Sequence, residues 1–215
     1  MATEIEIKRI LDAPGYARLR AHLDALVAPE RQEQVNHYLD LPDAALRQNG
    51  AMLRLRRVGD RLILTLKARA NVSNGVLRAQ ELERELTNAD ERAFWLQQPV
   101  RWSQAVARLG DWLELTGLAA LADRNTSLRE VGNTANLRCV YRLPNGVAGW
   151  QQPLTLELDC TRYPGEVDRL ELECEHADAV ALQPVLEAWL AAQGVTTVPA
   201  TETKYAQFLR LAAVA

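Results

Sequence analysis

The sequence predicts an α+β fold, built from a largely antiparallel sheet with helices in the middle and at the end of the chain. Three observations support this fold class: short segments that alternate polar and apolar residues, tight-turn dipeptides between such segments, and two stretches with apolar residues at helical spacing. The turn signals are Gly59-Asp60 and Asn145-Gly146. With 215 residues, the chain can form one large domain or two small ones.

The first 86 residues contain most of the strand signals. Strand periodicity covers residues 3–10, 32–39, 51–58, 61–68 and 76–86, and Gly59-Asp60 makes a hairpin of the third and fourth segments. A helix is expected over residues 12–26, because Tyr16, Leu19 and Leu23 are spaced for one helical face and Pro14 lies near its start. Residues 41–50 are expected to form a turn or short helix, and residues 71–75 a loop.

A helical pattern takes over from residue 88 to about residue 121, broken by Pro99 and Gly117. Strands are then expected at 123–131, 136–143, 154–160 and 168–175, followed by C-terminal helices at 178–193 and 201–213. The helical middle could mark a domain boundary. We interpret it as an insertion into a single domain spanning residues 1–215, because the strand sets on its two sides have matching charge patterns.

The composition excludes several classes of protein. A net charge of −3 and a pI of about 5.7 do not fit a nucleic-acid-binding domain, which is normally basic. The N-terminus has no secretory pattern, and no apolar stretch is long enough for a membrane helix, so we expect a cytoplasmic protein without nucleic-acid or membrane partners. The three cysteines and three histidines are scattered, which argues against a zinc site. Any metal must therefore bind to oxygen ligands.

The strands carry charged residues on one face, since residues i and i+2 of a strand point to the same side. The charges are segregated by strand: some strands stack carboxylates and the hairpin stacks cations. The carboxylates are Glu4 and Glu6, then Glu81, Glu83 and Glu85, then Glu157 and Asp159, then Glu171, Glu173 and Glu175; the cations are Arg54, Arg56, Lys67, Arg69 and Arg138, with Arg142 also on a strand of the second half.

An antiparallel sheet with one solvated face would explain any one of these strands. Segregation by sign argues against that explanation for the whole set, because like charges side by side on a free surface are mildly destabilising. A barrel with its polar side chains directed inward also fits. Clustered carboxylates suit hard cations such as Mg²⁺ or Mn²⁺, and clustered arginines suit phosphate. A site with both fits a phosphate chain bridged by metal.

Several motifs, in order along the chain, resemble the CYTH superfamily, also called triphosphate tunnel metalloenzymes. EIEIK at residues 4–8 resembles the ExExK signature that opens that family. NHYLD, MLRLRR, LILTLKAR and the acidic segment ending in ELERELT follow in the family's order, although Leu41 replaces the usual threonine. In the second half, ADRNTS, LTLELDC, RLELECE and TETKYAQFL complete the resemblance. It extends over essentially the whole chain.

The resemblance implies a closed eight-stranded antiparallel β-barrel, whose polar and charged interior forms a triphosphate tunnel, with flanking helices. It also implies roles for individual residues. Metal ligands would be Glu6, Glu171 and Glu173, with Glu4, Glu81, Glu83, Glu85 and Asp159 as further candidates for a second metal or for holding the attacking water. Phosphate would be bound by Lys8, Arg54, Arg56, Lys67, Arg69, Arg78, Arg124, Arg138 and Lys204. Lys8, Glu4 and Glu83 are the residues expected to take part in catalysis.

The family resemblance implies a hydrolase that uses one or two divalent cations, Mg²⁺ or Mn²⁺. Inorganic triphosphate is the favoured substrate, because nothing in the sequence indicates a dedicated organic pocket. Thiamine triphosphatase, nucleoside triphosphatase and class IV-type adenylate cyclase remain alternatives, since Trp95 or Trp102 could stack on an organic ring. Two other classes are a non-catalytic triphosphate sensor and a β-sandwich interaction domain. The sequence leaves the oligomeric state open.

Overall fold

The structure is a computed structural model that describes residues 2–165 and 167–213. These residues form two compact units, and each is described by itself. Unit 1 comprises Gln34–Ala70 and Ala79–Thr134 with the first residues of the chain, and unit 2 comprises Glu4–Glu33, Asn71–Arg78 and the segment from Ala135 onward. No helix among the described residues has the length and apolar character needed to span a bilayer.

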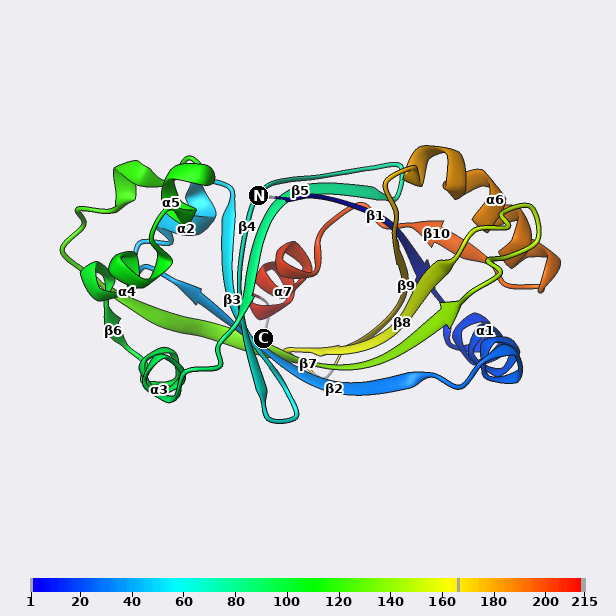
Figure 1. Cartoon of the computed structure of the whole chain (residues 1–215), viewed down its shortest axis with the longest axis horizontal. Coiled ribbons are helices and arrows are strands. Elements are labelled where there is room, and N and C mark those ends of the chain that lie inside the picture. Colours follow the sequence, from blue (N-terminus) through cyan, green and yellow to red (C-terminus); the bar gives the residue numbers. More distant parts are fainter. Residues whose placement is uncertain (1, 166, 214–215) are drawn as a thin grey trace. The chain divides into compact units, whose positions relative to one another are not determined.

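The strands are joined in a closed order (Figure 1). Their bounds are β1 Ala2–Leu11, β2 Glu30–Asp40, β3 Ala51–Val58, β4 Arg61–Ser73, β5 Val76–Glu85, β6 Val100–Arg101, β7 Ser127–Leu143, β8 Leu154–Tyr163, β9 Val167–Glu175 and β10 Thr197–Pro199. Hydrogen-bonded neighbours run β1-β5-β4-β3-β2-β7-β8-β9, and β9 pairs again with β1. The predicted closed, eight-stranded antiparallel barrel is thereby confirmed in its strand order, which leaves β6 and β10 as short additions to it.

The helices are α1 Ala13–Leu26, α2 Ala45–Gln48, α3 Ala89–Leu96, α4 Trp102–Leu109, α5 Trp112–Leu115, α6 Ala179–Ala192 and α7 Lys204–Ala212, with a 3₁₀ helix η1 at Ala119–Leu121. Three of the described α-helices, α1, α3 and α7, begin at a capping side chain. The Asp12 side chain accepts a hydrogen bond from the Gly15 N–H at the start of α1, and Asn88 and Thr203 cap α3 and α7 in the same way.

Two expectations about the strands were wrong, and a further short strand was missed. The loop expected at residues 71–75 is largely strand, because β4 continues to Ser73 and only Asn74 and Gly75, both at positive φ, form the turn. The two strands expected at 123–131 and 136–143 are the single strand β7, which continues through Gly132. The short strand β10 was not predicted, since three residues carry too little periodic signal.

Unit 1 has an apolar core on one face of the hairpin β3–β4. The hairpin register pairs Arg54 with Thr65 and Leu53 with Leu66, so the two faces differ in character. Leucines of the apolar face pack against residues of α2 to α5, including Trp95 and Trp102, which have no exposed surface. Figure 1 shows these helices on one side of β3 and β4.

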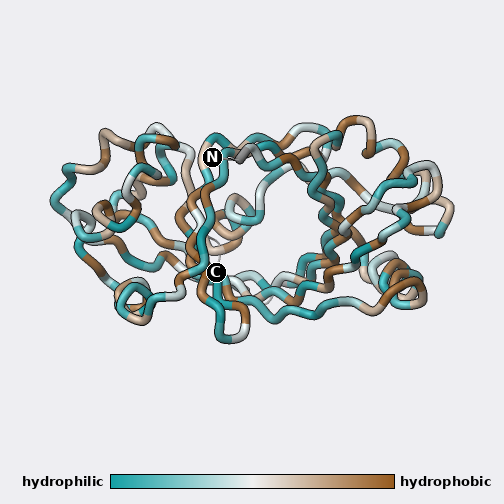
Figure 2. Tube along the Cα trace, in the orientation of Figure 1, coloured by the Kyte–Doolittle hydropathy of each residue, from teal (hydrophilic) through white to brown (hydrophobic). Residues whose placement is uncertain are grey.

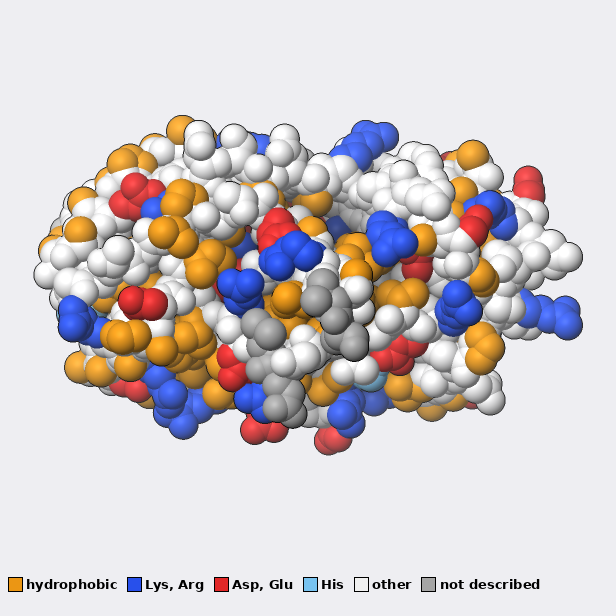
Figure 3. Space-filling model, turned by 180° about the vertical axis from the view of Figure 1, so that it is seen from behind, with side chains coloured by type: hydrophobic (Ala, Val, Ile, Leu, Met, Phe, Trp, Pro, Cys, Tyr) orange, Lys and Arg blue, Asp and Glu red, His pale blue; other side chains and the backbone are white. Residues whose placement is uncertain are grey.

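Unit 2 repeats this design with β1, β7, β8 and β9. Pairing of Glu157 with Glu173 and of Leu158 with Leu172 separates a charged face from an apolar one. The apolar residues pack against Leu19 and Leu23 of α1 and against Leu182 and Leu186 of α6. The alternation along the strands is visible as successive teal and brown segments in Figure 2. On the face seen in Figure 3, hydrophobic side chains lie scattered among charged and neutral ones.

The apolar face of β9 gives a direct test of this core. Leu172 has no exposed surface, so Leu172→Ala is expected to lower the free energy of unfolding by about 2–5 kcal/mol, measured by chemical denaturation. Leu137 of β7 is the matched control, because its side chain is 37% exposed, and Leu137→Ala is expected to cost less than about 1.5 kcal/mol. Equal losses in the two variants would contradict the assignment of the core.

Candidate functional site

The charged face of unit 2 contains a cluster of buried ion pairs. We call it the unit 2 cluster, and its members are Glu6, Lys8, Arg138, Glu157, Asp159, Glu171, Glu173 and Lys204. Cross-strand register brings the strand residues together, since Lys8 pairs with Glu173, Asp159 with Glu171, and Arg138 with Asp159. Lys204 joins them from the first position of α7.

Glu173 lies at the centre of this cluster. Its Oε1 accepts hydrogen bonds from the ammonium groups of Lys8 and Lys204, both at 2.6 Å, and its Oε2 accepts one from Arg138 Nη2 at 2.6 Å. Burial by itself would raise the pKa of Glu173, but Lys204, Lys8 and Arg138 hold that pKa well below its ordinary value. The carboxylate is therefore ionised at neutral pH despite its burial.

Asp159 is the second carboxylate with several donors. Its Oδ1 accepts from Arg138 Nε at 2.8 Å and from Asn136 Nδ2 at 2.9 Å, while its Oδ2 accepts from Arg138 Nη2 at 2.6 Å and from Lys204. Burial opposes ionisation, yet Arg138 and Lys204 lower the pKa of Asp159. Thr161 donates to the Oδ1 of Asn136 and so fixes the amide that holds Asp159.

The cations of the cluster respond in the opposite sense. Burial alone would lower the pKa of Lys8, but Glu173, Glu6 and Glu171 raise it well above the ordinary value. The pKa of Lys204 is raised as well, because Asp159 and Glu173 outweigh its desolvation. Both lysines are therefore protonated throughout the neutral range. Glu157 differs from the central carboxylates, since burial raises its pKa in spite of Arg138.

The main chain at Lys8 is held on both sides. Its N–H donates to the Gly75 carbonyl at 2.7 Å, and its carbonyl accepts from the Ala200 N–H at 3.1 Å. A Cβ on Gly75 would lie 3.0 Å from the Lys8 carbonyl oxygen, and the φ of +76° would strain any larger residue, so both features favour glycine here. The β4–β5 turn therefore fixes the backbone of Lys8, so that only its side chain is left to change conformation.

Glu171 is the least satisfied carboxylate of the cluster. It has no exposed surface, and neither of its oxygens accepts a hydrogen bond from the described residues, although Lys204 Nζ lies 3.4 Å from Oε2. Glu4 is also buried on the charged face of β1. Across residues 2–165 and 167–213, however, no group of three or more Asp, Glu, His or Cys side chains is arranged to hold a metal ion.

Unit 1 carries a second set of charged residues on the polar face of β3, β4 and β5. Arg54 is buried, donates to the Thr65 hydroxyl at 3.1 Å and lies 3.6 Å from Glu83. Thr65 in turn donates to Glu83 at 2.9 Å, and Lys67 lies 3.4 Å from Glu81. Two further contacts on this face join Arg56 to Asn36 at 3.0 Å and the exposed Glu85 to Arg61 at 2.9 Å.

Two predicted phosphate-binding residues depart from the expected face. Arg69 has a left-handed backbone with φ of 54°, which breaks the alternation shared by Thr65 and Lys67, and its guanidinium lies against Gly117. Arg78 is exposed, and the two-residue period puts it on the face of β5 opposite Glu81 and Glu83. The expectation that Arg69 continues the cationic row is therefore wrong, and Arg78 does not join the carboxylates that follow it.

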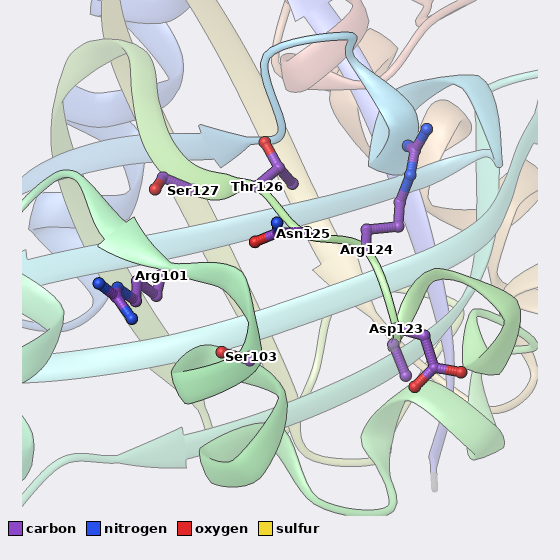
Figure 4. Close-up of a pocket in the computed structure, with 8 residues that line it drawn as sticks. Arg101, Ser103, Asp123, Arg124, Asn125, Thr126 and Ser127 are labelled. Atoms are coloured by element: carbon purple, nitrogen blue, oxygen red, sulfur yellow. The ribbon is translucent and has the colours of Figure 1, made fainter.

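Arg124 lies elsewhere in unit 1, beside an open hollow of about 620 Å³ lined by Arg101, Ser103, Ala122, Asp123, Arg124, Asn125, Thr126 and Ser127. It pairs with Asp43 at 2.6 Å. Figure 4 shows the side chains of Arg101 and Arg124 directed away from each other. The two guanidinium groups that line the hollow therefore do not converge on one anion position.

The residues that the sequence analysis missed are uncharged. Asn136 and Thr161 are buried on the charged face of unit 2, where Asn136 donates to Asp159 and Thr161 donates to Asn136. A signal for them exists in the two-residue period, since Asn136 precedes Arg138 by two positions and Thr161 follows Asp159 by two. Polar residues without charge are common in strands, so the period alone does not distinguish them.

Comparison with known proteins agrees with the resemblance seen in the sequence. "Putative triphosphatase YjbK" of Bacillus subtilis is 34% identical over 85 residues, which are 40% of this chain and 43% of that protein. The matched segment thus spans less than half of that relative.

Among solved structures, a Hippeastrum protein described as a "putative adenylyl cyclase" with "a dominant" triphosphatase activity has a TM-score of 0.81 at 26% identity, over 96% of this chain and 95% of that one. A Bacillus halodurans structure described as a putative adenylate cyclase has a TM-score of 0.61 at 22% identity, over 97% of this chain and 99% of that one, and shares the fold. The family model of the CYTH domain matches residues 2–204. By this match, which covers nearly all of its length, the chain belongs to the CYTH domain family.

Proposed function

We propose that this protein hydrolyses a phosphoanhydride bond of a linear triphosphate with the help of a divalent cation. The favoured substrate is inorganic triphosphate, which would give diphosphate and phosphate. The observation that carries the proposal is the unit 2 cluster, in which Lys8, Arg138 and Lys204 meet five carboxylates on one face of the sheet. The names given to the Bacillus subtilis and Hippeastrum relatives support the same reaction class.

The donor set of the cluster fits a hard divalent cation. Its carboxylates provide only oxygen ligands, which Mg²⁺ and Mn²⁺ prefer, and both buried oxygens of Glu171 lack a hydrogen-bond donor among the residues that the structure describes. Glu6, Glu171 and Glu173 would hold the ion, with Glu4 and Asp159 as further ligands. When bound, such an ion supplies positive charge and Lewis acidity to the phosphate chain.

The cations of the chain would bind and orient the phosphates. Lys8 and Lys204 would neutralise charge on the transferred group and on the leaving phosphate, which is the main task in phosphoryl transfer. Arg138 donates to both oxygens of Asp159 and to Glu173, so we assign it to positioning these carboxylates in addition to the phosphate contact predicted for it. Glu4 would act with Lys8 in catalysis.

For unit 1, the proposed roles concern the polar face of β3, β4 and β5. Arg54, Arg56 and Lys67 would bind phosphate oxygens, because guanidinium and ammonium groups are the usual protein donors to phosphate. Glu81, Glu83 and Glu85 remain proposed ligands of a second cation, with Glu83 also proposed in catalysis. Arg69, Arg78 and Arg124 stay proposals that rest on the family resemblance.

The choice of inorganic triphosphate over an organic one is supported by the position of two tryptophans. Trp95 and Trp102, which the sequence offered as stacking partners for a thiazolium or adenine ring, are fully buried in the core of unit 1. A side chain without exposed surface does not stack on a ligand. Nucleotide chemistry remains the second candidate, because the Hippeastrum relative is also described as an adenylyl cyclase. The free thiols of Cys139, Cys160 and Cys174 support a cytoplasmic location.

The proposal is tested by measuring phosphate release from inorganic triphosphate, ATP and thiamine triphosphate with Mg²⁺, with Mn²⁺ and with chelator. We expect metal-dependent release that is fastest from inorganic triphosphate. Preference for an organic triphosphate would overturn the proposed substrate. Formation of cyclic AMP from ATP without phosphate release from inorganic triphosphate would replace the hydrolase with a cyclase.

Lys8→Met tests the proposed role of the buried ammonium. We expect a loss of about 100-fold or more in kcat/KM for triphosphate, as found when a transition-state donor is removed, together with lower stability because Glu173 loses a partner. Arg142→Met is the control, since Arg142 is an exposed cation paired with Glu30. Circular dichroism must show folded protein in both variants. Undiminished kcat/KM in Lys8→Met would remove Lys8 from catalysis.

The pKa shifts of the cluster predict how stability depends on pH. Asp159 and Glu173 have lowered pKa values, so their contribution is fully present above the ordinary values of 3.8 and 4.5 and is lost as pH falls below them. Lys8 and Lys204 have raised pKa values, so their contribution to stability is fully present below the ordinary value of 10.5 and is lost as pH rises beyond it. These four groups should therefore contribute a constant stabilisation between about pH 5 and 10. Glu157 has a raised pKa, so its contribution has the opposite sign and is lost as pH rises above the ordinary value of 4.5. At acid pH, the melting temperature of Glu173→Gln should fall less steeply with decreasing pH than that of the wild type. An equally steep fall would contradict the assignment.

A further inference from the structure

Two carboxylates that are proposed to face the metal are already occupied by the protein's own cations. Glu173 Oε1 accepts from two ammonium groups, and each oxygen of Asp159 accepts from two donors. A carboxylate oxygen has two lone pairs, so these three oxygens have no further acceptor capacity. A divalent cation that approached them would also meet Lys8 and Lys204 at close range.

The charge balance of the cluster makes this competition quantitative. Glu6, Glu157, Asp159, Glu171 and Glu173 contribute five negative charges when ionised, and Lys8, Arg138 and Lys204 contribute three positive ones, so the remainder is −2. One divalent cation matches that remainder in charge. The geometry nevertheless opposes its entry, because Glu173 and Asp159 are covered. Lys204 Nζ also lies 3.4 Å from Oε2 of Glu171, whose oxygens accept no hydrogen bond from the described residues.

A phosphate chain changes this situation, because it offers the lysines other oxygens. Lys8 and Lys204 are flexible point charges on long stems, whereas Arg138 is held by paired hydrogen bonds to Asp159. The Lys204 side chain is 17% exposed and that of Lys8 is 5% exposed, so Lys204 is the easier of the two to displace.

We propose that the unit 2 cluster takes a divalent cation tightly only together with a phosphate chain, because Lys204 and Lys8 cover Glu173 and Asp159 until phosphate draws them away. The inference rests on the proposed function and specifies the species that the site accepts: a metal–polyphosphate complex, with free metal excluded. By reciprocity, the metal and the phosphate chain strengthen each other's binding by the same factor.

The test is a calorimetric titration of the full chain with Mn²⁺ alone, in the wild type and in Lys204→Met. Since the substitution uncovers Glu173 Oε1 and Asp159 Oδ2, the variant should bind free Mn²⁺ about fivefold or more tightly than the wild type, within the usual range of coupling factors. Arg210→Met is the matched control, because Arg210 lies on the same helix and pairs with Glu202 at an exposed site. Its Mn²⁺ affinity should equal that of the wild type.

Repeating the titrations at about 0.5 M KCl separates uncovered ligands from a general charge effect. Screening over roughly 4 Å removes long-range attraction, whereas the gain from freed oxygens persists. A gain that vanishes in salt, or no gain at all in Lys204→Met, overturns the inference. Melting curves of both variants confirm that folded protein is compared.

A second titration uses bis(methylene)triphosphonate, which cannot be hydrolysed, without metal. Wild type should bind it, and Lys204→Met should bind it more weakly although the same variant binds Mn²⁺ more tightly. Parallel loss of both affinities would overturn the inference. Triphosphatase activity of the wild type is measured separately, so that absent hydrolysis counts against the proposed function and leaves the result of the Mn²⁺ titrations to decide the inference.

Discussion

The two-residue period of the β-strand is the constraint on which the rest of this structure depends. Once Glu6, Lys8, Asp159 and Glu173 occupy alternate positions, every intervening residue faces the other way and must find an apolar partner. The apolar faces therefore require helices against them, α1 and α6 in unit 2 and α2 to α5 in unit 1. The two cores are in this sense a consequence of the charged faces.

Burial makes the charged face costly as well as organised. Ions taken out of water lose several kilocalories per mole each, and good pairing only offsets that loss. The buried ion pairs of the unit 2 cluster are thus expected to add little net stability to the fold, and a role in ligand binding explains them better. The directions of the cluster's pKa shifts agree with this view, because Glu173 and Asp159 stay ionised only through the lysines and the arginine beside them.

The sequence predicted the elements and the charged faces well, since both depend on strand alternation and capping residues such as Asp12. It failed where the backbone leaves the regular period. The left-handed backbone at Arg69 directs its side chain away from the face shared by Thr65 and Lys67. No residue in this segment is of a type that would predict such a change in the backbone. It also could not find Asn136 and Thr161, because neutral polar residues become informative only when cross-strand register brings them onto Asp159. The roles of the site residues rest on chemistry and on the family resemblance, which neither period nor register tests.

The hydrogen bonds on both sides of the Lys8 main chain have a kinetic consequence. With its N–H held by Gly75 and its carbonyl by Ala200, the lysine can change partners only by rotating its own side chain. The Lys8 side chain is 5% exposed, so this rotation depends on the side chains packed around it, but it needs no strand movement. The Lys8 ammonium can then move from one oxygen to a neighbouring one while the main chain around it stays in place. The strands that hold Lys8 therefore do not have to move when its ammonium group changes partners.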